Sequence, residues 1–402
     1  MAEELADQPE KVAEELADQP EKVAEELAAE FVFTDEQRQL RDAVRGFCAD
    51  HFDEQTVRRL MESDPPFDPA LWARLGGELG VLGLSVPEAD GGVGGTLVDQ
   101  AVAAEEFGAS LVCGPVFGTV YLAVPALVAA AAGPARDALL ADLVAGTRTA
   151  AFAASADRVS ADGDTLTGDL GPVVDAGAAD VLLVAATGPD WVGLYAVDAT
   201  AEGVERTPLV TLDLTRPQAT VTLANAPATL IAGPEDTERV VAHALHVGAA
   251  LLAVEQVGAA QHLLDLAVDY AKTRWQFGRP IGSFQAVKHR LADMLVDAEH
   301  ARSTAYHAVW ALTNGSDDPA LATAIAQAVC SSALSRIAAD TIQVLGGIGF
   351  TWEHQAHLYF KRATTDAALL GTAEQHRTRV ADLVLDSASP DRVPRVAAGT
   401  PG

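Results

Sequence analysis

The stretch that decides the fold runs from Tyr270 to Gln285 and reads Tyr-Ala-Lys-Thr-Arg-Trp-Gln-Phe-Gly-Arg-Pro-Ile-Gly-Ser-Phe-Gln. It places an arginine, a glutamine and an aromatic residue just before a Gly-Arg-Pro break. The guanidinium of Arg274 has a fixed fork of donors that suits phosphate oxygens, and Phe277 offers an aromatic face. These residue types are those of a site that holds a phosphate-bearing ligand.

A second cluster follows about seventy residues later, at Gln343, Gly346, Gly347 and Gly349, and runs into Phe-Thr-Trp-Glu-His at residues 350–354. Closely spaced glycines allow the backbone to approach a large ligand. The two clusters together therefore suggest a bound cofactor, although neither is a nucleotide motif by its spacing alone.

Together the clusters resemble the acyl-CoA dehydrogenase family, whose C-terminal helical domain carries an R-x-Q-F-G segment and a later Q-x-x-G-G-x-G-[FY]-T segment. The resemblance covers roughly residues 31–386. Residues 33–47 look like the opening helix of the family, and residues 80–92 and 105–108 resemble its N-terminal domain in the expected order. The family fold implies an α+β protein that is mainly α, with an N-terminal helical domain, a middle β domain and a C-terminal four-helix bundle.

The resemblance implies FAD as the cofactor and an acyl-CoA thioester as the substrate. It also implies a homo- or hetero-tetramer with another acyl-CoA dehydrogenase-like chain, and electron-transfer flavoprotein or a similar acceptor as the electron partner. The residues that match positions reaching the adenosine and pyrophosphate of a flavin held mainly by the neighbouring subunit are Arg274, Gln276, Phe277, Gln343, Gly346, Gly347 and Thr372.

Composition sets independent limits. With 402 residues and 49% hydrophobic content, the chain is long enough for two or three cores. Its formal charge of -30 disfavours nucleic acid and anionic membranes as partners. Three cysteines without metal-ligand spacing predict buried free thiols and no metal site. We expect a cytoplasmic protein that is neither secreted nor membrane-spanning, because the first residues are acidic and the apolar runs are interrupted.

Periodicity predicts three folded domains between two tails. Residues 31–148 have helical spacing, with long apolar runs at 97–107 and 119–131. Residues 149–234 form a middle β domain, with predicted strands at 181–184, 191–197, 209–214 and 219–223. Residues 235–386 return to long helices. The order of helix, sheet and helix is also that of the family.

The tails differ in character. Residues 1–30 form an acidic repeat in which AEELADQPEKV occurs at 2–12 and again at 13–23, with eleven acids and two lysines. Pro9 and Pro20 would interrupt a continuous helix, so we expect a solvated tail or, alternatively, an arm that docks on a partner. Residues 387–402, rich in Pro, Gly and Ala, are expected to be disordered.

The family's chemistry requires a base that this sequence lacks at both usual positions. In the family, a carboxylate removes the α-proton of the thioester while the β-hydrogen leaves as hydride to the flavin. Most members place this glutamate directly before a Gly-Thr pair, where Leu370 stands before Gly371-Thr372. Other members carry it on the helix that leads to R-x-Q-F-G, where Gly248 stands by ungapped counting.

Two acids near these positions are candidate substitutes. Glu255 follows Gly248 by two turns of the same helix, and Asp366 precedes Leu370 by one turn. The alternative for each is a solvated or capped surface carboxylate without a catalytic role. Glu353 and His354 match a Thr-x-Glu-His element of the family and are expected to hold a loop.

The middle domain also departs from the family pattern. Residues 151–164 lack the T-E-P-x-x-G-S-D turn, and Pro-Val-Val-Asp at 172–175 stands where a K-x-W-I-T-N strand should fall. Three functions stay open. The chain is the base-less subunit of a hetero-oligomeric acyl-CoA dehydrogenase, a self-sufficient desaturase with a relocated base, or a flavin-dependent monooxygenase of the same fold.

Overall fold

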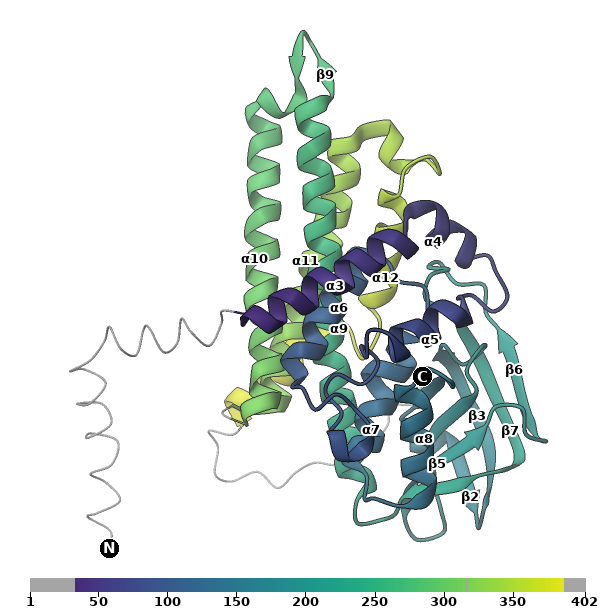
Figure 1. The fold of residues 1–402 in the computed structure, drawn as a ribbon. Helices are drawn as coiled ribbons and strands as arrows, with labels where there is room; N and C mark the ends of the chain where they lie inside the picture. The colour runs from purple at the N-terminus through teal and green to yellow at the C-terminus, as the bar shows by residue number, and fades with distance from the viewer. Residues whose placement is uncertain (1–32, 316, 387–402) are drawn as a thin grey trace, which may run out of the picture.

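The structure is a computed structural model that describes residues 33–315 and 317–386. The acidic repeat at residues 1–30 and the tail predicted at 387–402 lie outside the described residues. The N-terminal helices cross one another beside the bundle (Figure 1). They are α3 (Asp35–His51), α4 (Glu54–Leu60), α5 (Pro69–Gly77), the short η1 (Glu88–Asp90), α6 (Leu97–Ala109), the π-helix η2 (Val116–Ala123), α7 (Val124–Ala129) and α8 (Pro134–Val144).

Local sequence sets where these helices begin. Thr34 caps α3 through a capping box with Gln37, and Asp53 caps α4 by accepting a hydrogen bond from Thr56 N. Asp68 caps α5, whose first residue is a proline that needs no donor there. The predicted apolar run at 119–131 spans η2 and α7, a change of helix type that periodicity did not indicate.

The middle of the chain forms a sheet in the order β6-β7-β3-β2-β4-β5-β8, and β1 pairs in parallel with β4. Its strands are β1 (Ala150–Ala153), β2 (Val159–Asp162), β3 (Thr165–Val174), β4 (Val181–Thr187), β5 (Val192–Asp198), β6 (Val204–Pro208), β7 (Gln218–Pro227) and β8 (Thr229–Ala232). The strand predicted at 209–214 is wrong. That segment is a loop between β6 and β7, because Asp213 binds the backbone N–H and hydroxyl of Thr215 and so forms a turn.

The C-terminal part is a helical bundle capped by a two-stranded hairpin (Figure 1). Its elements are α9 (Thr237–Thr273), β9 (Trp275–Gln276), β10 (Arg279–Pro280), η4 (Ile281–Ser283), α10 (Gln285–Asn314), α11 (Pro319–Leu345), η5 (Gly346–Phe350), α12 (Ala356–Asp366), α13 (Ala373–Ala381) and η6 (Asp382–Asp386). The predicted fold class, mainly helical with a β domain in the middle, is confirmed.

Glycines let α6 and α9 touch backbone to backbone. A Cβ added at Gly108 would lie 1.9 Å from the carbonyl oxygen of Glu255, and one at Gly258 would lie 1.8 Å from that of Glu105. No larger residue fits either position without moving a helix. This contact joins the N-terminal helices to the bundle at the centre of the molecule.

Within residues 33–315 and 317–386, two helical stretches are long and apolar enough to cross a membrane, but packing in the core accounts for their composition. The most apolar window of α9 is 72% buried inside the fold, and that of the stretch from Pro319 to Phe350 is 61% buried. Cys48, Cys113 and Cys330 are buried and free, as predicted. Burial raises the pKa of Cys48 and of Cys113 to about 12, which keeps both as thiols.

Candidate functional site

The hairpin of residues 275–280 presents the first predicted cluster to solvent at the tip of the molecule (Figure 1). Arg274 ends α9, and Gln276 pairs with Arg279 across the hairpin. Phe277 has a φ of 52° and Gly278 a φ of 77°, which together turn the chain. The side chain of Phe277 is 91% exposed, an unfavourable position for an aromatic ring unless another molecule covers it.

The glycine segment, residues 346–350, lies at the same end of the bundle. The side-chain hydroxyl of Thr341 on α11 donates to the carbonyl of Leu263 on α9, so α11 ends roughly two turns below the hairpin. Gln343, Gly346 and Gly347 are exposed, and a Cβ added at either glycine would meet nothing within 4 Å. The backbone at these two glycines is not covered by other atoms, which leaves room for a large ligand to lie against it.

The structure does not bring Thr372 into this group. Thr372 caps α13, where its side chain accepts from Gln375 N. Helix α13 packs along the middle of α11, since Arg377 donates to Ser332. His354, in the element predicted to hold a loop, accepts a hydrogen bond from Ala356 N at the start of α12, and Glu353 is exposed.

Both usual base positions are filled by close packing. Leu370 has a φ of 56°, packs against the hydrophobic core and accepts a hydrogen bond on its carbonyl from His376. A Cβ added at Gly248 would lie 2.4 Å from the Cδ2 of Leu122. A glutamate at 248 would therefore require the side chain of Leu122 on η2 to move.

Glu255 and Asp366 belong to a buried ionic cluster, which we define as Asp213, Arg216, Glu255, Arg362 and Asp366. Arg216 pairs with Glu255 and, at 3.1 Å, with Asp366. Arg362 pairs with Glu255 at 2.6 Å and with Asp213 at 2.7 Å. The expectation that the two acids are solvated surface carboxylates is wrong, because both are at most 3% exposed and each is held by an arginine.

Carboxyl groups outnumber guanidinium groups in this region. The buried carboxyl of Asp175 lies near the cluster, so four acids face two arginines. Burial raises the pKa of Asp366 to about 7 against the opposing pull of Arg216 and Arg362. Burial also raises the pKa of Asp175 to about 6. Protonation of these two acids brings the cluster closer to neutrality.

The crevice between the helices and the sheet is filled by protein. Asp175 accepts from Gly118 N at 2.8 Å, and Thr119 exchanges hydrogen bonds with the backbone of Ala150. These bonds tie η2 to β1 and to the end of β3. The space left beside Arg216 and Glu255 is a void of about 10 Å³, which is the volume of a single water.

Comparison with known proteins gives the family. Residues 34–147 match the model described as acyl-CoA dehydrogenase, N-terminal domain, and residues 238–385 match acyl-CoA dehydrogenase, C-terminal domain. The chain is 38% identical to acyl-CoA dehydrogenase IpdE2 of Mycobacterium tuberculosis over 88% of its own length and 98% of that protein. The chain belongs to the acyl-CoA dehydrogenase family.

Two solved structures of this family are similar over nearly the whole chain. The structure described as "Tcur3481-Tcur3483 steroid ACAD G363A variant" has a TM-score of 0.80 and 31% identity, and covers 88% of this chain and 98% of its own. The ChsE4-ChsE5 complex from Mycobacterium tuberculosis has a TM-score of 0.81 and 27% identity, and covers 90% of this chain and 100% of its own.

Acyl-CoA dehydrogenases are FAD-binding oxidoreductases that act on acyl-CoA, and the residues present fit FAD on one side only. The hairpin and the glycine segment fit it, because Arg274 offers phosphate donors and the backbone at Gly346 is bare. The chain's own crevice does not fit it, because η2 is bonded directly to β1 and the ionic cluster fills the space beyond. When bound, FAD accepts the hydride that leaves the β-carbon of the acyl group.

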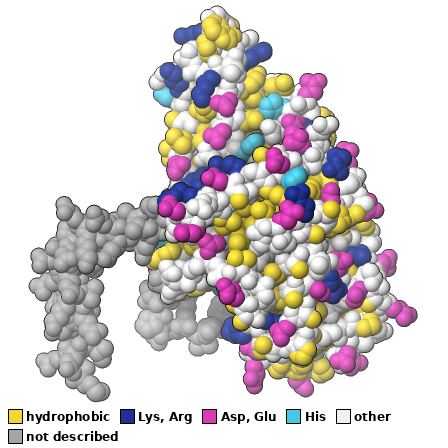
Figure 2. All heavy atoms as spheres, in the orientation of Figure 1, with side chains coloured by type: hydrophobic (Ala, Val, Ile, Leu, Met, Phe, Trp, Pro, Cys, Tyr) yellow, Lys and Arg dark blue, Asp and Glu magenta, His cyan; other side chains and the backbone are white. Residues whose placement is uncertain are grey.

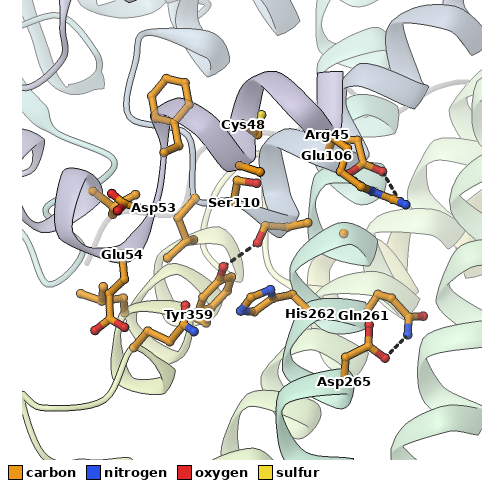
Figure 3. Close-up of a pocket in the computed structure, with 18 of the residues that line it drawn as sticks. Arg45, Cys48, Asp53, Glu54, Glu106, Ser110, Gln261, His262, Asp265 and Tyr359 are labelled. Carbon is orange, nitrogen blue, oxygen red and sulfur yellow. Dashed lines mark hydrogen bonds and ion pairs between the residues drawn. The ribbon is translucent and has the colours of Figure 1, made fainter. Parts of the chain in front are cut away.

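Another cavity lies elsewhere, between α3, α4, α6, α9 and α12. It has about 500 Å³ of space, and Figure 3 shows its polar residues around the opening. Asp53 and Asp265 line it, as does His262, which stacks on Tyr359. None of the predicted flavin residues lines this cavity. Its carboxylates make it a poor place for the phosphates of FAD or of coenzyme A.

Sequence reasoning missed Arg216 and Arg362, the two cations of the ionic cluster. One signal was present for Arg362, which stands four residues before Asp366 and so shares a helix face with it. Another was Asp213, which stands two residues before Thr215 in a sequence typical of a turn. Neither signal indicates burial.

Proposed function

We propose that this chain is the base-less subunit of a hetero-oligomeric acyl-CoA dehydrogenase. In this assembly the partner chain supplies the catalytic glutamate and most of the flavin pocket. This chain supplies Arg274, Gln276, Phe277, Gln343 and the glycines at 346 and 347 to the adenosine and pyrophosphate of the partner's flavin. Thr372 is assigned to the same flavin by resemblance only.

The observation that carries the proposal is a contrast between two ends of one chain. The hairpin and glycine segment are exposed and open, whereas the chain's own crevice is closed by η2 and the ionic cluster. A void of about 10 Å³ lined by paired charges is not a working flavin pocket of this chain. The two-chain descriptions of the similar structures support the same reading.

Within such an assembly each residue of this chain has a binding task. The guanidinium of Arg274 can bind two phosphate oxygens, and Phe277 covers an apolar or aromatic part of the cofactor. Removal of the α-proton is assigned to the partner's carboxylate. Electrons leave through electron-transfer flavoprotein or a similar acceptor, as the family relationship suggests.

The substrate to test first is an acyl-CoA with a steroid-derived acyl group, because a similar structure is described as a steroid ACAD. The chain should be purified alone and together with a family member that has the usual glutamate. Alone, it should be colourless and inactive with an artificial electron acceptor. Together, the two chains should hold one FAD per pair and turn over.

The competing reading is a self-sufficient enzyme with Glu255 or Asp366 as the base. The raised pKa of Asp366 favours it, since a base should titrate near the working pH. A yellow chain that turns over alone and loses activity on Glu255→Gln or Asp366→Asn would establish this reading instead. Oxygen-dependent turnover with reduced flavin would establish the monooxygenase.

A further inference from the structure

The proposed function gives no role to a second groove on the described surface or to the repeat at the start of the sequence. The groove has a volume of about 330 Å³ and lies between α10, α11 and α13. The repeat belongs to the arm, which we define as residues 2–30 with its eleven-residue repeat. The chemistry of the groove and that of the arm are complementary.

The groove has an apolar floor and a cationic rim. Ile325, Val329 and Val380 line the floor, and Ile325 is 37% exposed. Arg336 and Arg377 stand at the rim, together with His300. Arg336 is held by two short bonds to Asp297. Arg377 donates to the hydroxyl of Ser332 at 2.9 Å, and the acid it pairs with is the exposed Glu374, at 3.3 Å. Such an exposed pair contributes little, so Arg377 is available to another carboxylate.

The apolar surface continues beyond the groove. Val296 lies one turn before His300 on α10, on the same face of that helix, and is 67% exposed. An exposed apolar strip with a cationic edge is a surface suited to a segment that alternates aliphatic residues with acids.

The arm has that composition. Leucines recur at 5, 16 and 27 and valines at 12 and 23, and they stand among eleven acids and two lysines. The other segment outside the described range, residues 387–402, carries one acid and two arginines. The net charge of residues 387–402 has the same sign as that of the groove's rim, so charge complementarity favours the arm over this segment as the occupant of the groove.

The arm also starts within reach. Phe33, the first described residue, packs edge-on against Tyr306 of α10, with ring centroids 5.2 Å apart. His300 is six residues earlier on the same helix, roughly 9 Å along its axis. A segment of 29 residues needs only a small part of its length to cover that distance.

We propose that the acidic arm docks in the groove of its own chain, with its aliphatic residues against Ile325, Val329 and Val380 and its carboxylates near Arg377 and His300. This inference is independent of the proposed function, because none of the groove residues belongs to the hairpin, the glycine segment or the ionic cluster.

Hydrogen exchange of the full chain tests it. Deletion of residues 2–30 should speed amide exchange in segments 320–332 and 373–381 several-fold and leave the sheet unchanged. Arg377→Glu in the full chain should give the same increase, and the two changes together should give no more than either alone. The matched control is Arg239→Glu, at an exposed arginine on α9 outside the groove, which should change neither segment.

A peptide experiment keeps the proposal testable if Arg377→Glu does not fold. A synthetic peptide of residues 2–30 added to the shortened chain should restore protection, less so at high salt, and the same peptide with glutamines for glutamates should not. Unchanged exchange on deletion would overturn the proposal. So would protection that persists in the shortened chain and grows with protein concentration, since a second copy would then occupy the groove.

Discussion

Leu370 stands at the position where most family members have the catalytic glutamate, and its side chain packs against the core instead. A leucine at a φ of 56° costs on the order of 1 kcal/mol relative to a glycine, because its Cβ crowds the backbone. Contact of the side chain with the hydrophobic core offsets that cost. An apolar side chain thus stands where the resemblance places the base, just before Gly371 and Thr372.

Asp366 should make stability depend on pH. Its folded pKa of about 7 lies above the unfolded value of roughly 4, so the folded state binds the extra proton between these values. The free energy of unfolding should therefore fall as pH rises from about 4 to about 7. Urea unfolding of Asp366→Asn should show a weaker fall over this window. The control Asp42→Asn, at an exposed acid, should keep the wild-type slope.

Arg362 should be the most sensitive position of the ionic cluster. Arg362→Met removes the arginine that pairs with Asp213 and one of the two that pair with Glu255, and it leaves both carboxylates buried, which typically costs about 3–5 kcal/mol. Chemical denaturation should measure the loss as a lower midpoint. Arg239→Met, at a 58% exposed side chain, should change stability by no more than about 0.5 kcal/mol. Equal effects of the two changes would show that the cluster does not stabilise the fold.

At the scale of elements, the hairpin is the clearest functional unit. It projects beyond the bundle, its strands have only two residues each, and it exposes Trp275 and Phe277. A short hairpin with two exposed aromatics gains little from folding against its own chain. We therefore expect the hairpin to be stabilised further by what it contacts in the proposed assembly.

Arg274→Ala should weaken flavin binding in the two-chain complex. Loss of a charged bond to phosphate costs about 1.5–3 kcal/mol, so retention of FAD should fall by roughly 10- to 100-fold. Absorbance of the complex after dilution and gel filtration measures it. Lys272→Ala is the matched control, because Lys272 is also exposed near the hairpin but pairs with Asp269. Full FAD occupancy in the Arg274 variant would contradict the assigned role.

The fold could be predicted from the sequence, and candidate flavin residues could be named, for a physical reason. Helical periodicity is a local pattern, and so is the spacing within each motif, of Arg274 and Phe277 and of Gly346 and Gly347. Local patterns can be recognised in the sequence without knowledge of the tertiary structure. The ionic cluster is not local. Arg216 and Arg362 stand 146 residues apart, and a charged residue in a sequence is expected at the surface, so burial of Glu255 and Asp366 could not be predicted.

At residues 209–214 a local pattern was present but led to a wrong prediction. Its aliphatic residues predict a strand, but Val210 is fully exposed and Leu212 is 52% exposed, because the turn at Asp213 ends the pairing with β7. Local propensity favours a strand there, but the hydrogen bonds that Arg362 donates to Asp213 and Thr215 hold the segment as a loop.

At the scale of the whole molecule, exposed aromatics gather at one end. Trp275, Phe277, Phe350 and Trp352 are each at least 60% exposed and lie on the hairpin, the glycine segment and the loop after it. Figure 2 shows hydrophobic atoms at the tip of the molecule, above a body with many acidic side chains. Such an end is suited to burial against another subunit.

The chain should therefore be oligomeric when its partner is present. Light scattering of the two chains mixed at micromolar concentration should give a mass of two or four chains, and Phe350→Asp should lower it. A change to Val93→Asp, at an exposed apolar residue of the loop before α6, should leave the mass unchanged. A mixture that stays monomeric would exclude the assembly.

The packing of Leu122 against Gly248 has a consequence for the history of this chain. Leu370→Glu restores the missing carboxylate in a single step, yet it should restore no turnover to the isolated chain, because the crevice is already occupied by η2 and its bonds to Asp175 and Ala150. A self-sufficient site would need coordinated change in a helix, a strand and an ionic cluster, since changes at residues in contact do not act independently. Under the proposed function the two chains would therefore act only together, and their genes would have to be inherited together.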